Sequence, residues 1–302
     1  MKTNLLLAVL GLLASEGLVQ TQAFKQTLRR ASIASTPVEN RSVPPRLWKE
    51  PESHTPTYGR LDALHASSSE PTAVQKLDVD ALAKYSTALA TQMALFAGIF
   101  KATDYALTLA PFQVPFAVNC VLFWMVALRS RVLNPLNNSR PKTDNLETEG
   151  SAKRNMPTWT PPGFIFPIMW ILIIGPIRAA TTAMVYNVTG SYANIAILSL
   201  MLHLSIGDCW NSVNNVERRY GASVVGGLLV WLSNAHAAYQ YSQVSPVAGQ
   251  LLCIPLVWLT VASALIIRTW QLNPDPQSGE PYPLYPVEGQ AKTDFVWFQK
   301  SS

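Results

Sequence analysis

The side chains of this chain that could do chemistry within apolar surroundings are few. Arg178, His203, Asp208 and His236 stand inside long apolar stretches, where an ionisable group is costly and often functional. A histidine there could ligate haem iron or hydrogen-bond a propionate, but a neutral histidine bonded to a nearby carbonyl or hydroxyl is more common. No Ser-His-Asp, Cys-His or metal-ligand constellation is present in the sequence, so we expect neither a hydrolase site nor a metal site.

Depth along the predicted helices separates the two charged groups. At 1.5 Å per residue, Asp208 lies about 8 Å from the basic helix ends, where it could snorkel, relay protons, or pair with Arg218 or Arg219. Arg178 lies roughly 27 Å from those ends, so we expect it to reach the opposite headgroups rather than pair with Asp208. An arginine at either depth could instead take a ligand carboxylate.

Three tryptophans share a level with His203. By the same rise, Trp170, His203 and Trp231 lie about 15–16 Å from the basic ends, and Trp258 lies about 20 Å from them. Polar-tipped aromatic side chains prefer the membrane interface, so this many near mid-depth need a reason. One reason is a pocket for a flat apolar ligand. The other is packing between helices, or rings turned into lipid.

The elements that must position these residues are long apolar helices. The chain of 302 residues is 49% hydrophobic and 14% charged, and its charges are sparse from residue 155 to 274, which excludes a soluble two-domain enzyme. Five runs are long enough to cross a bilayer. They are Pro111–Leu128, Pro161–Asn187, Tyr192–Val213, Gly221–Tyr241 and Val247–Trp270. We therefore expect an all-α, polytopic membrane helix bundle with five core transmembrane helices.

An extra helix is expected upstream of these five. Leu82–Leu109 is apolar but contains Lys101 and Asp104, so it could be a sixth span or an amphipathic helix along the interface. Basic residues flank one set of helix ends only, which places that face and the C-terminus on the cytosolic or equivalent organellar side. The expected segments are a signal peptide (1–23), a transit-peptide-like and disordered segment (24–80), the extra helix (81–110), the transmembrane bundle (111–272) and a proline-rich tail (273–302).

Several function classes are excluded by composition. The net charge of +5 comes without a basic stripe interleaved with aromatic residues, so we expect no nucleic-acid partner. Lysine is absent between Lys153 and Lys292, which leaves no residue for a retinal Schiff base. The three cysteines lie in apolar runs and do not form a disulfide framework.

The N-terminal residues have the pattern of a targeting leader. Residues 1–23 have the basic start, short apolar run and small-residue cleavage site of a signal peptide, and 24–80 begins basic and rich in Ser, Thr and Pro. The combination resembles the bipartite plastid leaders of diatoms and related algae. We expect a plastid membrane of an alga; a plain secretory signal with a disordered linker, and an endomembrane or mitochondrial location, are the alternatives.

One segment is far more specific than hydropathy. In Trp159-Thr-Pro-Pro-Gly-Phe-Ile-Phe-Pro-Ile-Met-Trp170, Trp159 suits the membrane interface, and Pro161 and Pro162 suit a first helical turn. Phe166 and Trp170, four residues apart, should stack on one helix face. We expect this segment to begin a span and to bring its aromatic rings into the bundle.

This pattern resembles the TspO/MBR family, also called translocator proteins or tryptophan-rich sensory proteins. The resemblance covers about residues 111–273 and includes Trp210 near the end of the third helix, and Trp258 with the small residue Ala262 in the fifth. It departs at Gly207, where the family has Asn, at Asn214-Asn215, where it has aromatic residues, and near Ile266, which replaces another Asn. The departures leave the fold expectation intact and weaken the expectations of standard ligand specificity and sterol binding.

The resemblance implies a membrane protein that binds, and transports or senses, tetrapyrroles such as protoporphyrin IX or haem. The expected ligand-binding residues are Phe166, Trp170, His203, Trp210, Trp231, Trp258 and Ala262. Light- and oxygen-dependent porphyrin breakdown, by Trp170 and Trp258, is implied as well. No cofactor is required; membrane lipid and the tetrapyrrole are the expected partners, and a homodimer is left open. The alternative is a structural or partner-binding membrane protein without porphyrin chemistry.

Overall fold

The computed structural model describes residues 75–110, 112–137, 154–276 and 278–298. The expected signal peptide and almost all of the transit-like segment lie outside them. The described residues are helical, and their only β pairings are two isolated bridges, Leu77 with Val287 and Leu136 with Phe295. The predicted all-α helix bundle is confirmed.

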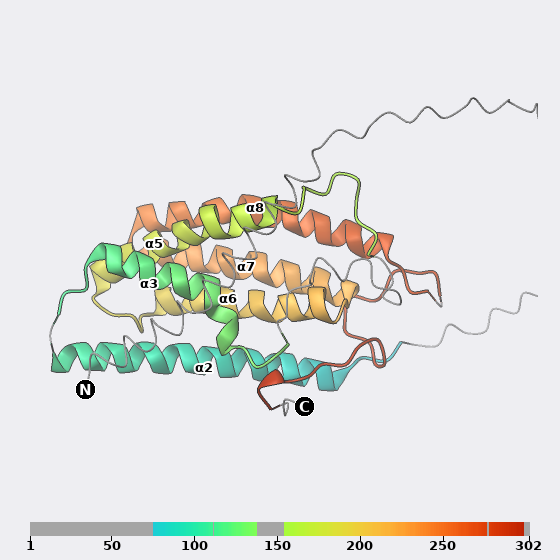
Figure 1. Ribbon diagram of the computed structural model, residues 1–302, viewed down its shortest axis with the longest axis horizontal. Helices are drawn as coiled ribbons and strands as arrows, with labels where there is room; N and C mark the ends of the chain where they lie inside the picture. Colours follow the sequence, from blue (N-terminus) through green and yellow to red (C-terminus); the bar gives the residue numbers. More distant parts are fainter. Residues whose placement is uncertain (1–74, 111, 138–153, 277, 299–302) are drawn as a thin grey trace, which may run out of the picture. The chain divides into compact units, whose positions relative to one another are not determined.

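The long helices run side by side along the long axis of the bundle (Figure 1). In chain order they are α2 (Val79–Leu109), α3 (Phe116–Arg129) with a 3₁₀ turn (Ser130–Leu133), α4 (Ile165–Pro167) continued by a π-helix (Ile168–Ile174) and α5 (Gly175–Thr189), α6 (Ile195–Asn211) with a π turn (Ser212–Val216), α7 (Tyr220–Val244) and α8 (Pro246–Leu272). Each of the five expected core runs therefore contains a helix.

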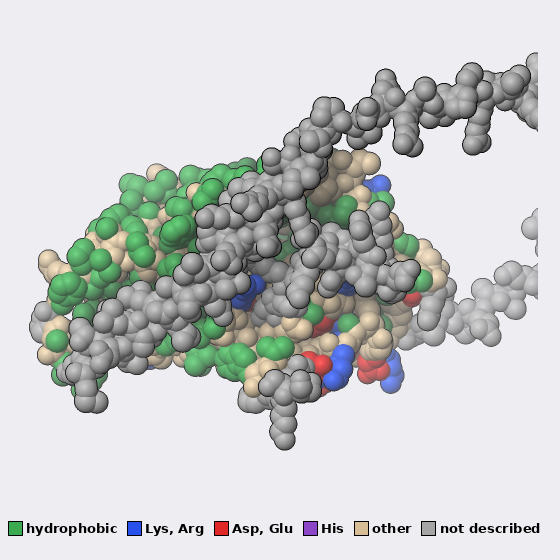
Figure 2. Space-filling view, viewed as in Figure 1, with side chains coloured by type: hydrophobic (Ala, Val, Ile, Leu, Met, Phe, Trp, Pro, Cys, Tyr) green, Lys and Arg blue, Asp and Glu red, His purple; other side chains and the backbone are tan. Residues whose placement is uncertain are grey.

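Three helical runs of the described chain are long and apolar enough to cross a membrane. They are Phe116–Leu133, Ile165–Thr189 and Pro246–Leu272. α6 and α7 are more polar or shorter, but α7 packs extensively on α8, and α6 on α7. Hydrophobic side chains cover much of the visible face, while most visible charges gather at one end (Figure 2).

α2 belongs to the bundle. It runs alongside α6 (Figure 1), and Phe96 and Phe100 on α2 are buried in the core. The hydrogen bonds of Asp104 explain why this apolar helix carries a carboxylate. Its carboxylate accepts hydrogen bonds from the backbone N–H groups of Tyr192 (2.8 Å) and Ala193 (2.9 Å), which precede α6. The carboxylate thereby satisfies backbone donors of the turn that leads into α6.

The tandem prolines lie before the helix, not in its first turn. The prediction for Pro161 and Pro162 is wrong, because α4 begins at Ile165, whose N–H bonds to the Pro162 carbonyl at 2.9 Å. A residue followed by proline is disfavoured in the α conformation, and both Thr160 and Pro161 are followed by one. Trp159, at 49% exposure, remains at the surface.

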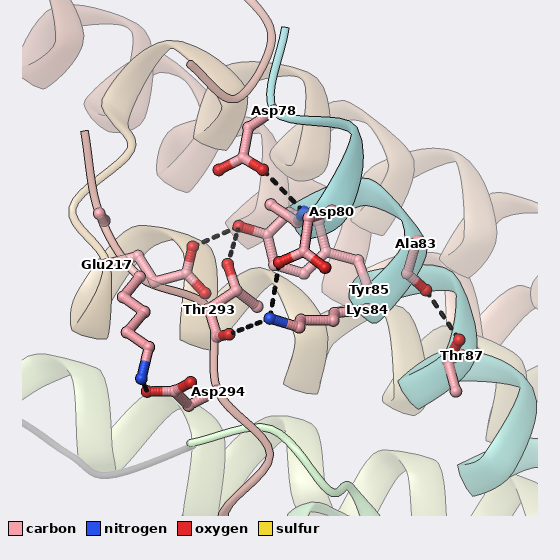
Figure 3. A network of polar contacts seen from close by, with 12 residues as sticks. Asp78, Asp80, Ala83, Lys84, Tyr85, Thr87, Glu217, Thr293 and Asp294 are labelled. Carbon is pink, nitrogen blue, oxygen red and sulfur yellow. Dashed lines mark hydrogen bonds and ion pairs between the residues drawn. The ribbon is translucent and has the colours of Figure 1, made fainter. Parts of the chain in front are cut away.

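The C-terminal tail returns to the charged end of the bundle, beside the start of α2 (Figure 3). Arg219, fully buried, pairs with Asp78 (2.6 Å) and Glu217 (2.9 Å) and donates to the carbonyls of Val287 and Ala291 (both 2.8 Å). We call these residues the Arg219 network. It joins α2, α7 and the tail through one guanidinium.

Candidate ligand-binding cavity

A cavity of about 660 Å³ is lined by residues of every helix from α3 to α8 and of the π-helix between α4 and α5. Phe166, Trp170, His203 and Trp210, four of the expected ligand-binding residues, line it. Ligand pockets typically enclose about 300–1,000 Å³. The cavity therefore has the size of a site for one small molecule.

A glycine-proline pair shapes the wall that carries Trp170. Pro176 has no N–H, so in the preceding π-helix the carbonyl of Ile171 lacks its donor five residues on. Trp124 of α3 donates its indole Nε1–H to this carbonyl instead, at 3.1 Å. Gly175 permits the approach, because a Cβ there would lie 2.9 Å from Trp124 Nε1. This bond fixes the segment that presents Trp170.

The second aromatic wall depends on two glycines of α7. Trp210 donates Nε1–H to the Ser223 carbonyl at 3.1 Å, and its ring lies against Gly226, where a Cβ would come within 2.9 Å of Trp210 Cδ1. Gly227 lines the cavity itself. The glycine pair thus serves close helix packing, and one of its members also lines the cavity.

Arg178 lies inside the bundle, so the prediction that it reaches the opposite headgroups is wrong. Its guanidinium donates to His203 Nε2 and lies over the Trp170 ring, 5.4 Å from its centroid. The physical reason is that helical side chains lean towards the helix N-terminus, which here points Arg178 back to Trp170. Depth counted at the backbone misses this lean.

His203 is a neutral imidazole with a defined tautomer. The Arg178 guanidinium can only donate, so Nε2 accepts from it and Nδ1 carries the proton, which faces the Val230 carbonyl at 3.1 Å and the Ser233 hydroxyl at 3.0 Å. Because Nε2 is occupied in this way, His203 positions Arg178. A neutral buried histidine bonded to a nearby carbonyl is the role that the sequence made more common, and the structure shows it.

Asp208 also lines the cavity, but neither Arg218 nor Arg219 forms an ion pair with it among the described residues. It accepts from Gln92 Nε2 at 2.8 Å, and Gln92 in turn accepts from Asn134 Nδ2 at 2.7 Å. Gln92 belongs to α2. The upstream helix therefore supplies the hydrogen bond that holds the acidic group of the cavity.

Three expected residues do not line the cavity. Trp258 and Ala262 of α8 each lie one residue, about 100°, from a lining position. The lining positions on α8 are Leu259, Ser263, Leu265, Ile266 and Thr269. Trp258 instead contacts the Phe166 ring edge-on, with centroids 5.7 Å apart.

The same rotation applies on α7. Val230 lines the cavity, while its neighbour Trp231 donates Nε1–H to Thr260 on α8 at 3.1 Å. His236, further along α7, is exposed and is not a lining residue. The rise per residue predicted how deep these side chains lie along the helices, but it could not predict which way they point around the helix axis.

Two charged lining residues, Arg131 and Arg154, were not among the expected site residues. Arg154 donates to the hydroxyl of Tyr220 (3.2 Å) and to the carbonyl of Asn214. Both arginines belong to the basic residues that flank one set of helix ends, and from the sequence that charge indicated only the orientation in the membrane. The positions that depart from the family pattern also line the cavity: Gly207, Asn214, Asn215 and Ile266. Their departure from the family pattern was the signal in the sequence that pointed to these positions.

Comparison with known proteins decides the family. Residues 138–271 match the model of the TspO/MBR family. The translocator protein of Bos taurus is 30% identical over 131 residues, 42% of this chain and 77% of that protein. The chain belongs to the TspO/MBR family.

Two bacterial relatives support the same assignment. Protein CrtK of Rhodobacter capsulatus is 25% identical over 123 residues, 39% of this chain and 74% of that protein. The tryptophan-rich sensory protein of Cereibacter sphaeroides is 26% identical over 119 residues, 39% and 73% of the two chains. With its apolar helices, this TspO/MBR protein is an integral membrane protein. α2, α3 and the tail lie outside the family match.

Proposed function

We propose that this TspO/MBR protein binds a tetrapyrrole, such as protoporphyrin IX or haem, and transports or senses it. The observation that carries the proposal is the cavity of about 660 Å³ walled by Phe166, Trp170 and Trp210. Aromatic faces hold a flat apolar ring by stacking and burial. The names of the relatives, translocator and tryptophan-rich sensory protein, agree with binding followed by transport or signalling.

The polar part of the lining suits the charged edge of such a ligand. Arg131, Arg154 and Arg178 line the cavity with one acidic residue, Asp208. Three formal positive charges against one negative charge favour an anionic ligand over a neutral or cationic one. A tetrapyrrole with propionate groups combines an apolar ring with such an edge.

The test is titration of the purified protein in lipid nanodiscs with protoporphyrin IX, followed by porphyrin fluorescence anisotropy. We expect saturable binding, weakened about tenfold by Trp170→Ala because a stacking face is lost. Trp231→Ala is the matched control, since that tryptophan does not line the cavity, and should bind as the unaltered protein does.

Two results would contradict the proposal. Non-saturable binding would leave the alternative of a structural or partner-binding membrane protein. Equal weakening by Trp170→Ala and Trp231→Ala would move porphyrin binding away from the cavity. Trp258→Ala should weaken binding less than Trp170→Ala, because Trp258 acts through Phe166.

We also propose a plastid membrane as the location, on the composition of residues 1–80. The full chain with a fluorescent C-terminal tag should enter plastids of an algal host, and the same chain without residues 1–48 should not. The same location for both forms would contradict this part of the proposal.

A further inference from the structure

Arg178 is a buried cation without an anionic partner. It is 6% exposed, lines the cavity, and forms no ion pair with any carboxylate of the described residues. Its Nε–H is buried without a hydrogen-bond partner. A buried charge is ordinarily paired, because removal from water is costly. The cavity therefore presents an unused donor group and a positive charge with which Asp208, the carboxylate of the described lining, forms no ion pair.

The neighbours of Arg178 hold its side chain but do not neutralise it. His203 contributes only a lone pair, since its proton is on Nδ1, which faces the Val230 carbonyl and the Ser233 hydroxyl. Trp170 contributes its ring face, a weak partner for a cation. The cluster of Arg178, His203 and Trp170 therefore keeps a net charge of +1 next to the aromatic wall.

The other charged residues of the lining are either hydrogen-bonded to protein groups or partly exposed to solvent. Arg154 already donates to Tyr220, Asn214 and Asn215, and Asp208 is held by Gln92 on α2. Arg131 is half-buried, so solvent moderates its charge. Arg178 combines deep burial, an unused N–H and contact with the ring of Trp170.

We propose that Arg178 is a carboxylate-binding subsite, and that the ligand of this protein is a flat apolar ring system carrying an ionised carboxylate. The guanidinium binds the carboxylate while the ring packs on Trp170 and Phe166. The proposal rests on the proposed function in taking the cavity as the binding site, and it narrows the ligand to acids. It does not require that the ring be a tetrapyrrole.

The test compares two fluorescent probes of one shape, 1-pyrenebutyric acid and 1-pyrenebutanol, on the full protein in nanodiscs at pH 7. The nanodisc lipid is zwitterionic, and empty nanodiscs correct for partitioning. We expect the acid to bind about tenfold to a hundredfold more tightly than the alcohol, as for a hydrogen bond to a charged group. Arg178→Gln should remove this preference by weakening the acid alone. Arg268→Gln, the matched control at an exposed arginine that does not line the cavity, should keep it.

Equal binding of acid and alcohol to the unaltered protein would overturn the proposal, and this comparison needs no variant to fold. Retention of the preference in Arg178→Gln would overturn it too. Protoporphyrin IX and its dimethyl ester separate the two proposals. Acid-selective pyrene binding without any porphyrin binding would keep the subsite and reject the tetrapyrrole. Equal binding of porphyrin acid and ester would keep the tetrapyrrole and reject the subsite.

Discussion

At the scale of single residues, the Ile171 carbonyl lacks a backbone donor because of a proline, and a tryptophan of another helix supplies one. Pro176 removes the N–H that would close the π-helix on Ile171, and Trp124 supplies a donor from another helix. The bond links α3 to the segment carrying Trp170. A local backbone defect is thereby converted into a tertiary contact next to the cavity.

We predict that Trp124→Phe lowers the free energy of unfolding by about 1–3 kcal/mol, since it leaves the partly buried Ile171 carbonyl unpaired. In a Pro176→Ala background the new N–H can take that carbonyl, so the same substitution should cost less than half as much. Denaturant unfolding of the four proteins of the cycle in detergent measures this coupling. Trp159→Phe, at an exposed indole, should change stability by less than about 0.5 kcal/mol. Equal costs of Trp124→Phe in both backgrounds would show that the hydrogen bond is not the cause.

At the scale of elements, hydropathy was enough for the helices because a run of about 20 apolar residues has few alternatives in a bilayer. It could not decide the role of α2. Asp104 looked like evidence for an interfacial helix, and only the backbone of Tyr192 and Ala193 reveals what it satisfies. A polar residue in an apolar helix is interpretable once its partner on another helix is known.

The candidate site was predictable in part for the same reason. The rise per residue fixes depth, and it put Trp170 and His203 at the level where both line the cavity. The facing direction of each helix depends on packing against its neighbours, so Trp231 and Ala262 were assigned to a cavity they do not line. Arg178 was misplaced because its lean towards Trp170 is a side-chain property.

At the scale of the whole molecule, the Arg219 network holds both ends of the described chain against α7. Asp78 caps α2 by accepting the N–H of Ala81 at 2.9 Å. The tail packs so closely on α7 that a Cβ at Gly221 would lie 2.0 Å from the carbonyl oxygen of Pro283. Burial alone would raise the pKa of Asp78. The Ala81 N–H and the Arg219 guanidinium outweigh it and hold the pKa of Asp78 below its ordinary value of 3.8.

That lowered pKa gives the network a pH dependence of known sign. The folded state favours the ionised Asp78, so its contribution is complete above about pH 5 and is lost as the pH falls through 3.8 and below. We predict that Asp78→Asn lowers the free energy of unfolding by about 1–2 kcal/mol at pH 7 and by less at pH 3. Thermal unfolding in nanodiscs at the two pH values measures it. An equal loss at both would contradict an electrostatic origin.

Arg219→Met extends the same prediction from one carboxylate to the whole network. It removes the common partner of Asp78, Glu217 and two tail carbonyls, and should cost about 3–5 kcal/mol, as for one side of a buried ion pair. Because the tail would lose its anchor, limited proteolysis should cut within residues 282–293 well before the helices unfold. Arg268→Met, at an exposed arginine bonded to Gln271, removes the same charge without a tail contact and should leave cleavage unchanged. A tail equally protected in both variants would mean that apolar packing, not Arg219, holds it against the bundle.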